Sequence, residues 1–228
     1  MPQSDSNGLQ DVINKANFLT IDKRKVTAES ISRSGHYKTA QRSPSLYSFT
    51  IGAPQGLKYS TNRDLLEDLD SMDRIVEANV DIGANNTSIA YITEYQGDAN
   101  ATIRTTKHEI TGFNGNVFYI TSDSWPASDY LFKKGDYLQP TGNTNTYRYP
   151  YQVTSDVPNN SAANISVPVH RPILSQTGVT IASGSKGNFR VGSDVRFHVK
   201  AIKMPTYSVV PHDLIEFSAD FELIEVIT

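Results

Sequence analysis

The sequence predicts a mainly β protein, and three observations support that fold class. Of the 228 residues, 38% are hydrophobic and 20% are charged, a balance that allows a packed core and disfavours wholesale disorder. Apolar and polar residues alternate with a period of two in several segments, as they do in half-buried strands. The chain contains no Cys, which excludes disulfides, thiolate zinc sites and a cysteine nucleophile.

The first elements are one strand and two helical patterns of unequal strength. A faint helical pattern spans residues 9–16, and residues 47–51 read Tyr-Ser-Phe-Thr-Ile, which predicts a strand. The clearer helix is expected at residues 61–76, where apolar residues recur at spacings of three and four. Acidic residues cover the opposite face of this helix, as expected for a solvated side, and those in the first turn suit the helix dipole.

Alternation predicts four strands in the middle of the chain. Residues 76–82 alternate Val, Ala, Val and Ile with Glu, Asn and Asp. Three further strands are expected at residues 89–95, 102–111 and 117–121. Gly-Phe-Asn-Gly at residues 112–115 separates the last two and ends in Asn-Gly, which is a turn signal.

The second half continues the β pattern. Residues 147–153 are interrupted by Pro150, which indicates an edge or bulged strand. Alternating segments follow at residues 165–169 and 195–199. The longest pattern is at residues 215–223, with Ile, Phe, Ala, Phe and Leu on one face and Glu, Ser, Asp and Glu on the other.

Turn-rich segments divide the chain into an outer unit and an insertion. Residues 83–86 and 203–206 mark the two boundaries. Residues 1–80 and 205–228 would then pair as one outer domain, and residues 81–204 would form a β-rich insertion. No low-complexity tract and no clean internal repeat is found.

Known catalytic and metal-binding patterns are missing from the sequence. The five His residues lack metal-ligand spacing and are interpreted as isolated strand or surface residues. Gly-Ser-Lys-Gly at residues 184–187 lacks the spacing of a phosphate loop and indicates a turn. We therefore expect no catalytic residue, no metal and no cofactor, and an enzyme is the least favoured functional class.

Charge and hydropathy restrict the partners. The net charge of −3 argues against a general nucleic-acid binder. The first eight residues lack a secretory pattern, and no apolar run approaches the roughly 20 residues of a transmembrane helix. The protein is therefore expected to be made in the cytoplasm and not to insert into a membrane.

The two ends of the chain carry opposite charge. Residues 1–58 hold eight basic and four acidic residues, whereas residues 207–228 hold five acidic residues and no Lys or Arg. Three explanations remain open. The segments could neutralise each other within one sheet, meet between neighbouring copies in a ring, or present an acidic face to a channel through which a polyanion passes.

Several segments resemble small tail proteins of tailed bacteriophages. Residues 32–42, Ser-Arg-Ser-Gly-His-Tyr-Lys-Thr-Ala-Gln-Arg, precede the aromatic strand and the helix in the order found in that family. The family's first aromatic strand often carries Trp, whereas this chain has Tyr47. Three blocks are similar to a small barrel inserted in those proteins, and one resembles their closing strand. The blocks are residues 131–139, 151–157 and 167–174, and the strand is residues 217–225.

The resemblance implies a fold and an architectural role. The fold would be a tail-tube-like β-sandwich with one flanking α-helix and an inserted small β-barrel domain. Copies would join edge to edge, usually in hexameric rings, at the tube tip or baseplate of the virion. The implied partners are identical subunits and other tube, sheath or baseplate proteins, with DNA only in transit. Edge-to-edge assembly fits long strands, whose unpaired edges are a liability in a monomer.

Three sets of candidate interface residues follow. Lumen-facing acidic candidates are Glu216, Asp220 and Glu222. Candidates for a basic inter-subunit edge are Arg24, Lys25, Arg33 and Arg42. Tyr147, Tyr149 and Tyr151 fall on one side of a strand and suit a partner- or sugar-binding face, although an ordinary outward strand face is the favoured explanation. The tyrosines support an alternative function, a receptor- or carbohydrate-binding module of the same particle.

Overall fold

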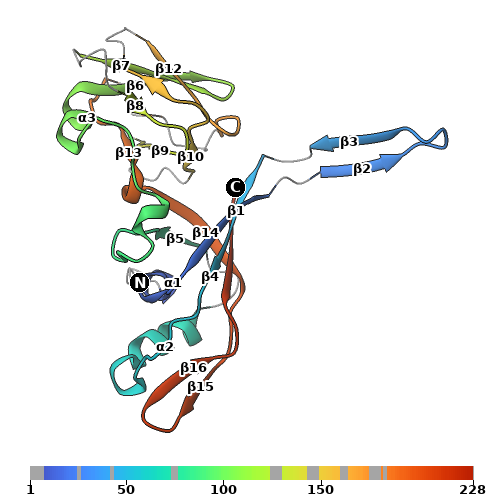
Figure 1. Cartoon of the computed structure of the whole chain (residues 1–228), viewed down its shortest axis with the longest axis vertical. Helices are drawn as coiled ribbons and strands as arrows, with labels where there is room; N and C mark the ends of the chain where they lie inside the picture. The colour runs from blue at the N-terminus through green and yellow to red at the C-terminus, as the bar shows by residue number, and fades with distance from the viewer. Residues whose placement is uncertain are drawn as a thin grey trace.

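A five-stranded antiparallel sheet forms the centre of the molecule (Figure 1). The computed structural model describes residues 8–24, 27–41, 44–72, 77–123, 130–142, 149–159, 164–174, 181 and 184–227. The strand order is β1–β4–β17–β14–β5. These strands are β1 (Leu19–Arg24), β4 (Leu46–Ile51), β17 (Phe221–Glu225), β14 (Arg196–Lys203) and β5 (Glu77–Asp81). Strand exceeds helix by 43% to 18%, so the prediction of a mainly β protein is confirmed.

The central sheet joins segments that lie far apart in the sequence. β4 pairs with β17 in a register that sets Phe49 against Leu223. β14 lies between β17 and β5, whereas the expected boundary at residue 204 assigns residues 196–203 to the insertion. The apolar residues of the alternating segments face one core, because successive side chains of a strand point to opposite faces.

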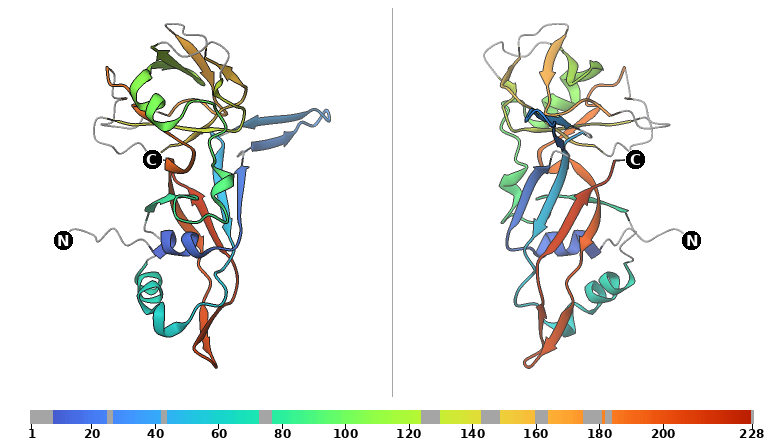
Figure 2. Two further views of the ribbon diagram at one scale, coloured as in Figure 1. Left: turned by 60° about the vertical axis from the view of Figure 1, so that its left-hand side comes forward. Right: turned by 90° about the vertical axis from the view of Figure 1, so that its right-hand side faces the viewer.

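Short helices cover this sheet and extend below it. The faint pattern at residues 9–16 forms α1 (Gly8–Lys15), whose Leu9, Val12 and Ile13 are fully buried against the sheet. The expected helix at residues 61–76 is shorter, because α2 (Arg63–Ser71) is preceded by a 3₁₀ turn at Tyr59–Thr61 and followed by extended Met72. Figure 2 shows α1 crossing one face of the sheet.

One expected strand is wrong, and a second is correct only over its last four residues. Residues 89–95 contain a 3₁₀ turn at Ala90–Ile92, and residues 102–111 divide into α3 (Ala101–Lys107) and β6 (His108–Asn114). The Asn100 side chain accepts a hydrogen bond from Ile103 N at 3.0 Å and so caps the helix. The Thr-rich composition favours a strand, but this cap and the contacts of the helix outweigh such weak propensities.

The insertion forms a second unit with its own apolar core. β6 pairs with β7 (Val117–Ser122), which also pairs with β12 (Ile165–Pro168). Two further small sheets complete the unit. They comprise β8 (Tyr130–Phe132) with β11 (Val157–Pro158), and β9 (Tyr137–Pro140) with β10 (Tyr151–Gln152) and β13 (Phe189–Val191). The β6–β7 turn falls at Gly115–Asn116, later than expected, because Gly112 continues the strand at a bulge.

The expected barrel is not closed in the described part of the chain. Its ladders are short, since β10 and β11 have two residues each. Proline limits their extension because it lacks the N–H group that a ladder needs, and Pro150 directly precedes β10. The structure also contains three helices among the described residues, where the sequence predicts one clear helix.

Two β-ribbons project from the body (Figures 1 and 2). The first, which we call the arm, consists of β2 (Thr27–Ile31) and β3 (Tyr37–Gln41). The second consists of β15 (Tyr207–Val210) and β16 (Leu214–Phe217) at the opposite end. The long strand expected at residues 215–223 is therefore divided, because residues 218–220 bend between β16 and β17.

Candidate assembly interface

The arm ends in an exposed apolar pair. Ile31 and Tyr37 lie directly opposite each other in the β2–β3 register, and their exposed fractions are 72% and 59%. The turn between them is closed by hydrogen bonds from Gly35 N to Ser32 O and from Ser32 N to His36 O, both 2.9 Å. A bond to Glu29 raises the pKa of Tyr37. The arm is thus a well-formed hairpin whose apolar tip its own chain leaves uncovered.

The basic candidates do not gather at one edge of the described structure. Arg24 ends β1 opposite Leu46, whereas Arg33 is exposed in the turn at the tip of the arm. Lys25 and Arg42 lie outside the described residues. Because the arm separates Arg24 from Arg33, only Arg33 is placed at a projecting tip.

The acidic candidates lie in three different settings. Glu216 is exposed on β16. Asp220 Oδ1 accepts a hydrogen bond from Ala53 N at 3.1 Å, and Glu222 on β17 lies 3.4 Å from Lys203 Nζ. The structure therefore brings Glu216 and Asp220 to the same pocket but pairs Glu222 with a lysine, which separates it from any acidic face.

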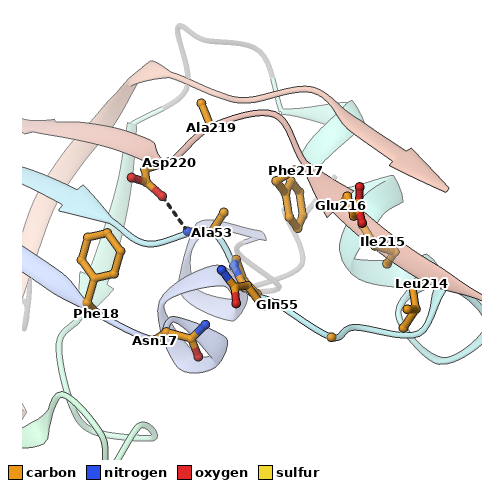
Figure 3. Close-up of a pocket in the computed structure, with 12 residues that line it drawn as sticks. Asn17, Phe18, Ala53, Gln55, Leu214, Ile215, Glu216, Phe217, Ala219 and Asp220 are labelled. Atoms are coloured by element: carbon orange, nitrogen blue, oxygen red, sulfur yellow. Dashed lines mark hydrogen bonds between the residues drawn. The ribbon is translucent and has the colours of Figure 1, made fainter. Parts of the chain in front are cut away.

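A pocket lies where α1, β1, β4 and β16 approach one another (Figure 3). Its volume is about 470 Å³, within the range of roughly 300–1,000 Å³ typical of binding pockets. Phe18, Ala53 and Phe217 supply apolar surface, and Glu216 and Asp220 supply carboxylates. None of the twelve lining residues is Lys or Arg, so the pocket carries only negative side-chain charge.

Gly52 allows the chain to pass close to this pocket. A Cβ atom at this position would lie 2.5 Å from the ring of Phe18. Gly52 N also donates a hydrogen bond to Phe18 O at 2.9 Å. The absence of a side chain thus fixes how closely the Phe18 ring lies against β4, and with it one wall of the pocket.

The aromatic candidates correct one interpretation. Tyr149 and Tyr151 are fully buried in the core of the insertion, and Tyr151 Oη accepts a hydrogen bond from Leu174 N at 2.9 Å. They therefore cannot form a partner-facing surface on the folded chain. Tyr147 lies outside the described residues. A period of two separates the two faces of a strand but does not tell which face the rest of the chain covers.

Sequence reasoning missed a buried ion pair that joins the two units. Arg171 of the insertion donates two hydrogen bonds of 2.6 Å to Glu225 of β17. It also donates to Ser45 O at 2.8 Å and to Pro150 O at 3.0 Å. Although burial opposes its charge, the bonds to Glu225 raise the pKa of the Arg171 guanidinium. No local pattern in the sequence distinguishes Arg171 from a surface arginine.

His170 adjoins this pair and is held neutral. Burial, together with the Arg171 cation, lowers the pKa of His170 to about 3. Its Nδ1 accepts a hydrogen bond from Gln152 N at 3.0 Å, and its ring lies 5.1 Å from that of Tyr47. These contacts make His170 a packing residue of the junction.

The two outer edges of the central sheet differ in how they are covered by other parts of the described chain. β1 and β5 are its outermost strands, and no described strand lies beyond β1. The Gln10 side chain covers part of the other margin, because it accepts from Asp81 N at 2.7 Å and donates to Asp81 O at 3.0 Å. Such caps prevent unwanted pairing at a sheet edge, so the β1 margin is the better place for another strand to add.

The described residues offer neither a metal-binding cluster nor a membrane-spanning helix. They contain no group of three or more His, Asp or Glu side chains placed to hold a metal ion. None of the helices in the same part of the chain is long and apolar enough to cross a membrane.

A scan of protein-family models finds no match to this chain, and a search of curated proteins finds none either.

Proposed function

We propose that this protein is a structural component of a phage tail, which forms a ring at the tube tip or baseplate and connects neighbouring tail proteins. It carries out no bond chemistry in this role. In this proposal the central sheet with α1 corresponds to the tail-tube-like layer. The second unit, which contains α3 and β6 to β13, corresponds to the inserted small barrel that contacts other tail proteins.

One observation carries the proposal beyond the resemblance. The central sheet ends at β1 without a further described strand, and the arm leaves the body beside it. An open sheet edge is a template on which another chain can pair. A chain that keeps such an edge together with an exposed apolar hairpin is suited to a neighbour that covers both.

Identical neighbours would generate a closed assembly. Contacts between different surfaces of identical copies are heterologous, and they give a ring where the rotation closes and a filament where it does not. Backbone hydrogen bonds would supply the contact along β1, and apolar burial would add to it at the arm. The assembled copies then act as a scaffold that holds neighbouring tail proteins in place.

Electron microscopy of the purified full-length chain tests this function, together with light scattering to determine the mass. We expect closed rings, and we expect labelled protein at the tail tip of the particle. A chain that remains monomeric at every concentration and is missing from virions would refute the proposal.

The receptor- or carbohydrate-binding alternative is not proposed. It depended on the tyrosines at residues 147–151, and Tyr149 and Tyr151 are buried.

A further inference from the structure

The arm carries a pair of large apolar side chains that contribute little to the core of the chain because they are mostly exposed. Ile31 has the highest exposed fraction among the large hydrophobic residues described, 72%, and Tyr37 stands opposite it. Removal of such side chains from water stabilises a contact in proportion to the area buried. The exposed Arg33 in the adjoining turn places a positive charge next to this pair.

The pocket has the complementary chemistry. It combines apolar walls, including Phe18 and Phe217, with the carboxylates of Glu216 and Asp220 (Figure 3). Asp220 is held by Ala53 N, while Glu216 is exposed and also lines the site. An apolar pair flanked by an arginine therefore matches this pocket in both hydropathy and sign of charge.

The arm and the pocket lie at opposite ends of the same ribbon. The pocket adjoins the end of the β1–β4 pair where Leu19 faces Ile51, and the arm leaves from the end where Arg24 faces Leu46. Five residue steps along a strand separate these ends by about 17 Å. The arm also points away from the body (Figures 1 and 2). The arm of a copy therefore does not reach the pocket of the same copy, so an arm tip that fills this pocket must belong to a second copy.

We propose that the tip of the arm of one copy docks in the pocket of the next copy, with the Ile31 and Tyr37 side chains inserted and Arg33 facing Glu216. This inference rests on the proposed self-assembly and names the contact that makes it directional. Because the two surfaces differ, each copy offers an arm at one end and a pocket at the other, which is a heterologous contact.

Cross-linking of the full-length chain tests the contact directly. The chain contains no Cys, so two single-cysteine variants, Ile31→Cys and Gln55→Cys, give an unambiguous cross-link when mixed with a short bismaleimide. Gln55 lines the pocket and is exposed. The control mixture pairs Ile31→Cys with Tyr91→Cys, because Tyr91 is 70% exposed on the 3₁₀ turn at Ala90–Ile92, outside the pocket lining. We expect heterodimers in the first mixture and only background in the second.

A substitution experiment measures the strength of the contact. The double variant Ile31→Ser and Tyr37→Ser should raise the dissociation constant of self-association by about 100-fold, as measured by sedimentation, because two apolar side chains lose their burial. Its melting temperature should match that of the unmodified protein, since both side chains are exposed in the monomer. The matched control, Tyr91→Ser, should leave association unchanged.

The outcomes separate this inference from the proposed function. If rings form but the Ile31–Gln55 mixture cross-links no more than the control, the contact is wrong and the ring-forming role stands. If the double variant associates as the unmodified chain does, the contact is likewise wrong. If no self-association occurs at any concentration, both proposals fail.

Discussion

Loss of the Arg171 side chain should destabilise the protein severely. The Arg171→Met variant keeps a long apolar stem but removes the two bonds of 2.6 Å to Glu225 and the bonds to Ser45 O and Pro150 O. Glu225 would then be a buried carboxylate, 2% exposed, without its cation. Breaking a buried ion pair from one side typically costs about 3–5 kcal/mol. We expect a loss of about 4 kcal/mol in the free energy of unfolding.

Urea denaturation monitored by tyrosine fluorescence and by circular dichroism gives the measurement. Because Arg171 belongs to the insertion and Glu225 to the central sheet, the variant should also unfold in two separated steps instead of one cooperative transition. The double variant Arg171→Met and Glu225→Leu should recover part of the loss, since it leaves no charge buried alone. It will not recover all, because Tyr47 N donates to Glu225 at 3.2 Å and would lose its acceptor.

A surface pair provides the matched control. Lys203 and Glu222 lie 3.4 Å apart with side chains about half exposed, and Lys203→Met should change stability by less than about 1 kcal/mol. If Arg171→Met costs no more than this control, the buried pair does not hold the two units together and the reasoning is refuted.

Three further predictions concern the pocket and the junction. Gly52→Ala should cost less than about 1 kcal/mol, because its Cβ would meet the Phe18 ring at 2.5 Å but this ring is 48% exposed and can turn away into solvent; adding Phe18→Ala should remove this cost in thermal melts, and a loss that persists in the double variant would contradict the contact. The low pKa of His170, about 3, means that the folded state binds its proton less readily than the unfolded state, with a pKa of 6.5. The contribution of His170 to the free energy of unfolding should therefore be complete above pH 6.5 and fall as the pH drops toward 3. The His170→Phe variant should show a weaker dependence of stability on pH in this range. A variant that keeps the full dependence would contradict the low pKa of His170. Glu216→Lys should leave the melting temperature unchanged, since the side chain is exposed, but weaken self-association several-fold through repulsion of Arg33; equal association of both proteins in sedimentation would count against the docked arm.

The sequence predicts the strands whose alternation matches a half-buried sheet. Residues 47–51 lie in β4, residues 117–121 in β7, and all but the last of residues 165–169 in β12, because alternation with a period of two follows directly from one buried face. For residues 102–107 the prediction of a strand is wrong. Their Thr and Ile side chains suit a strand, but the Asn100 cap starts a helix, and single-residue propensities are too small to predict that outcome.

The candidate site was less accessible to sequence reasoning than the fold. Tyr149 and Tyr151 show why, since alternation indicates two faces but not the segment that packs over each. The pocket brings together Phe18, Ala53 and Glu216, which are far apart in the chain and meet only through the pairing of β1, β4 and β17. Arg171 and Glu225 are likewise separated by the chain that forms β13 to β16, and their contact follows from the tertiary fold alone.

The place of β17 in the central sheet has a consequence for biosynthesis. This strand lies between β4 and β14, yet the ribosome makes it after every other strand of the sheet. Until it emerges, β4 and β14 cannot be bridged, and such non-local pairings close slowly. The Glu225 carboxylate that anchors Arg171 also arrives with this strand. Translation of β17 thus sets the earliest moment at which the central sheet can be completed, and in the proposed assembly a copy would meet its neighbours only after that moment.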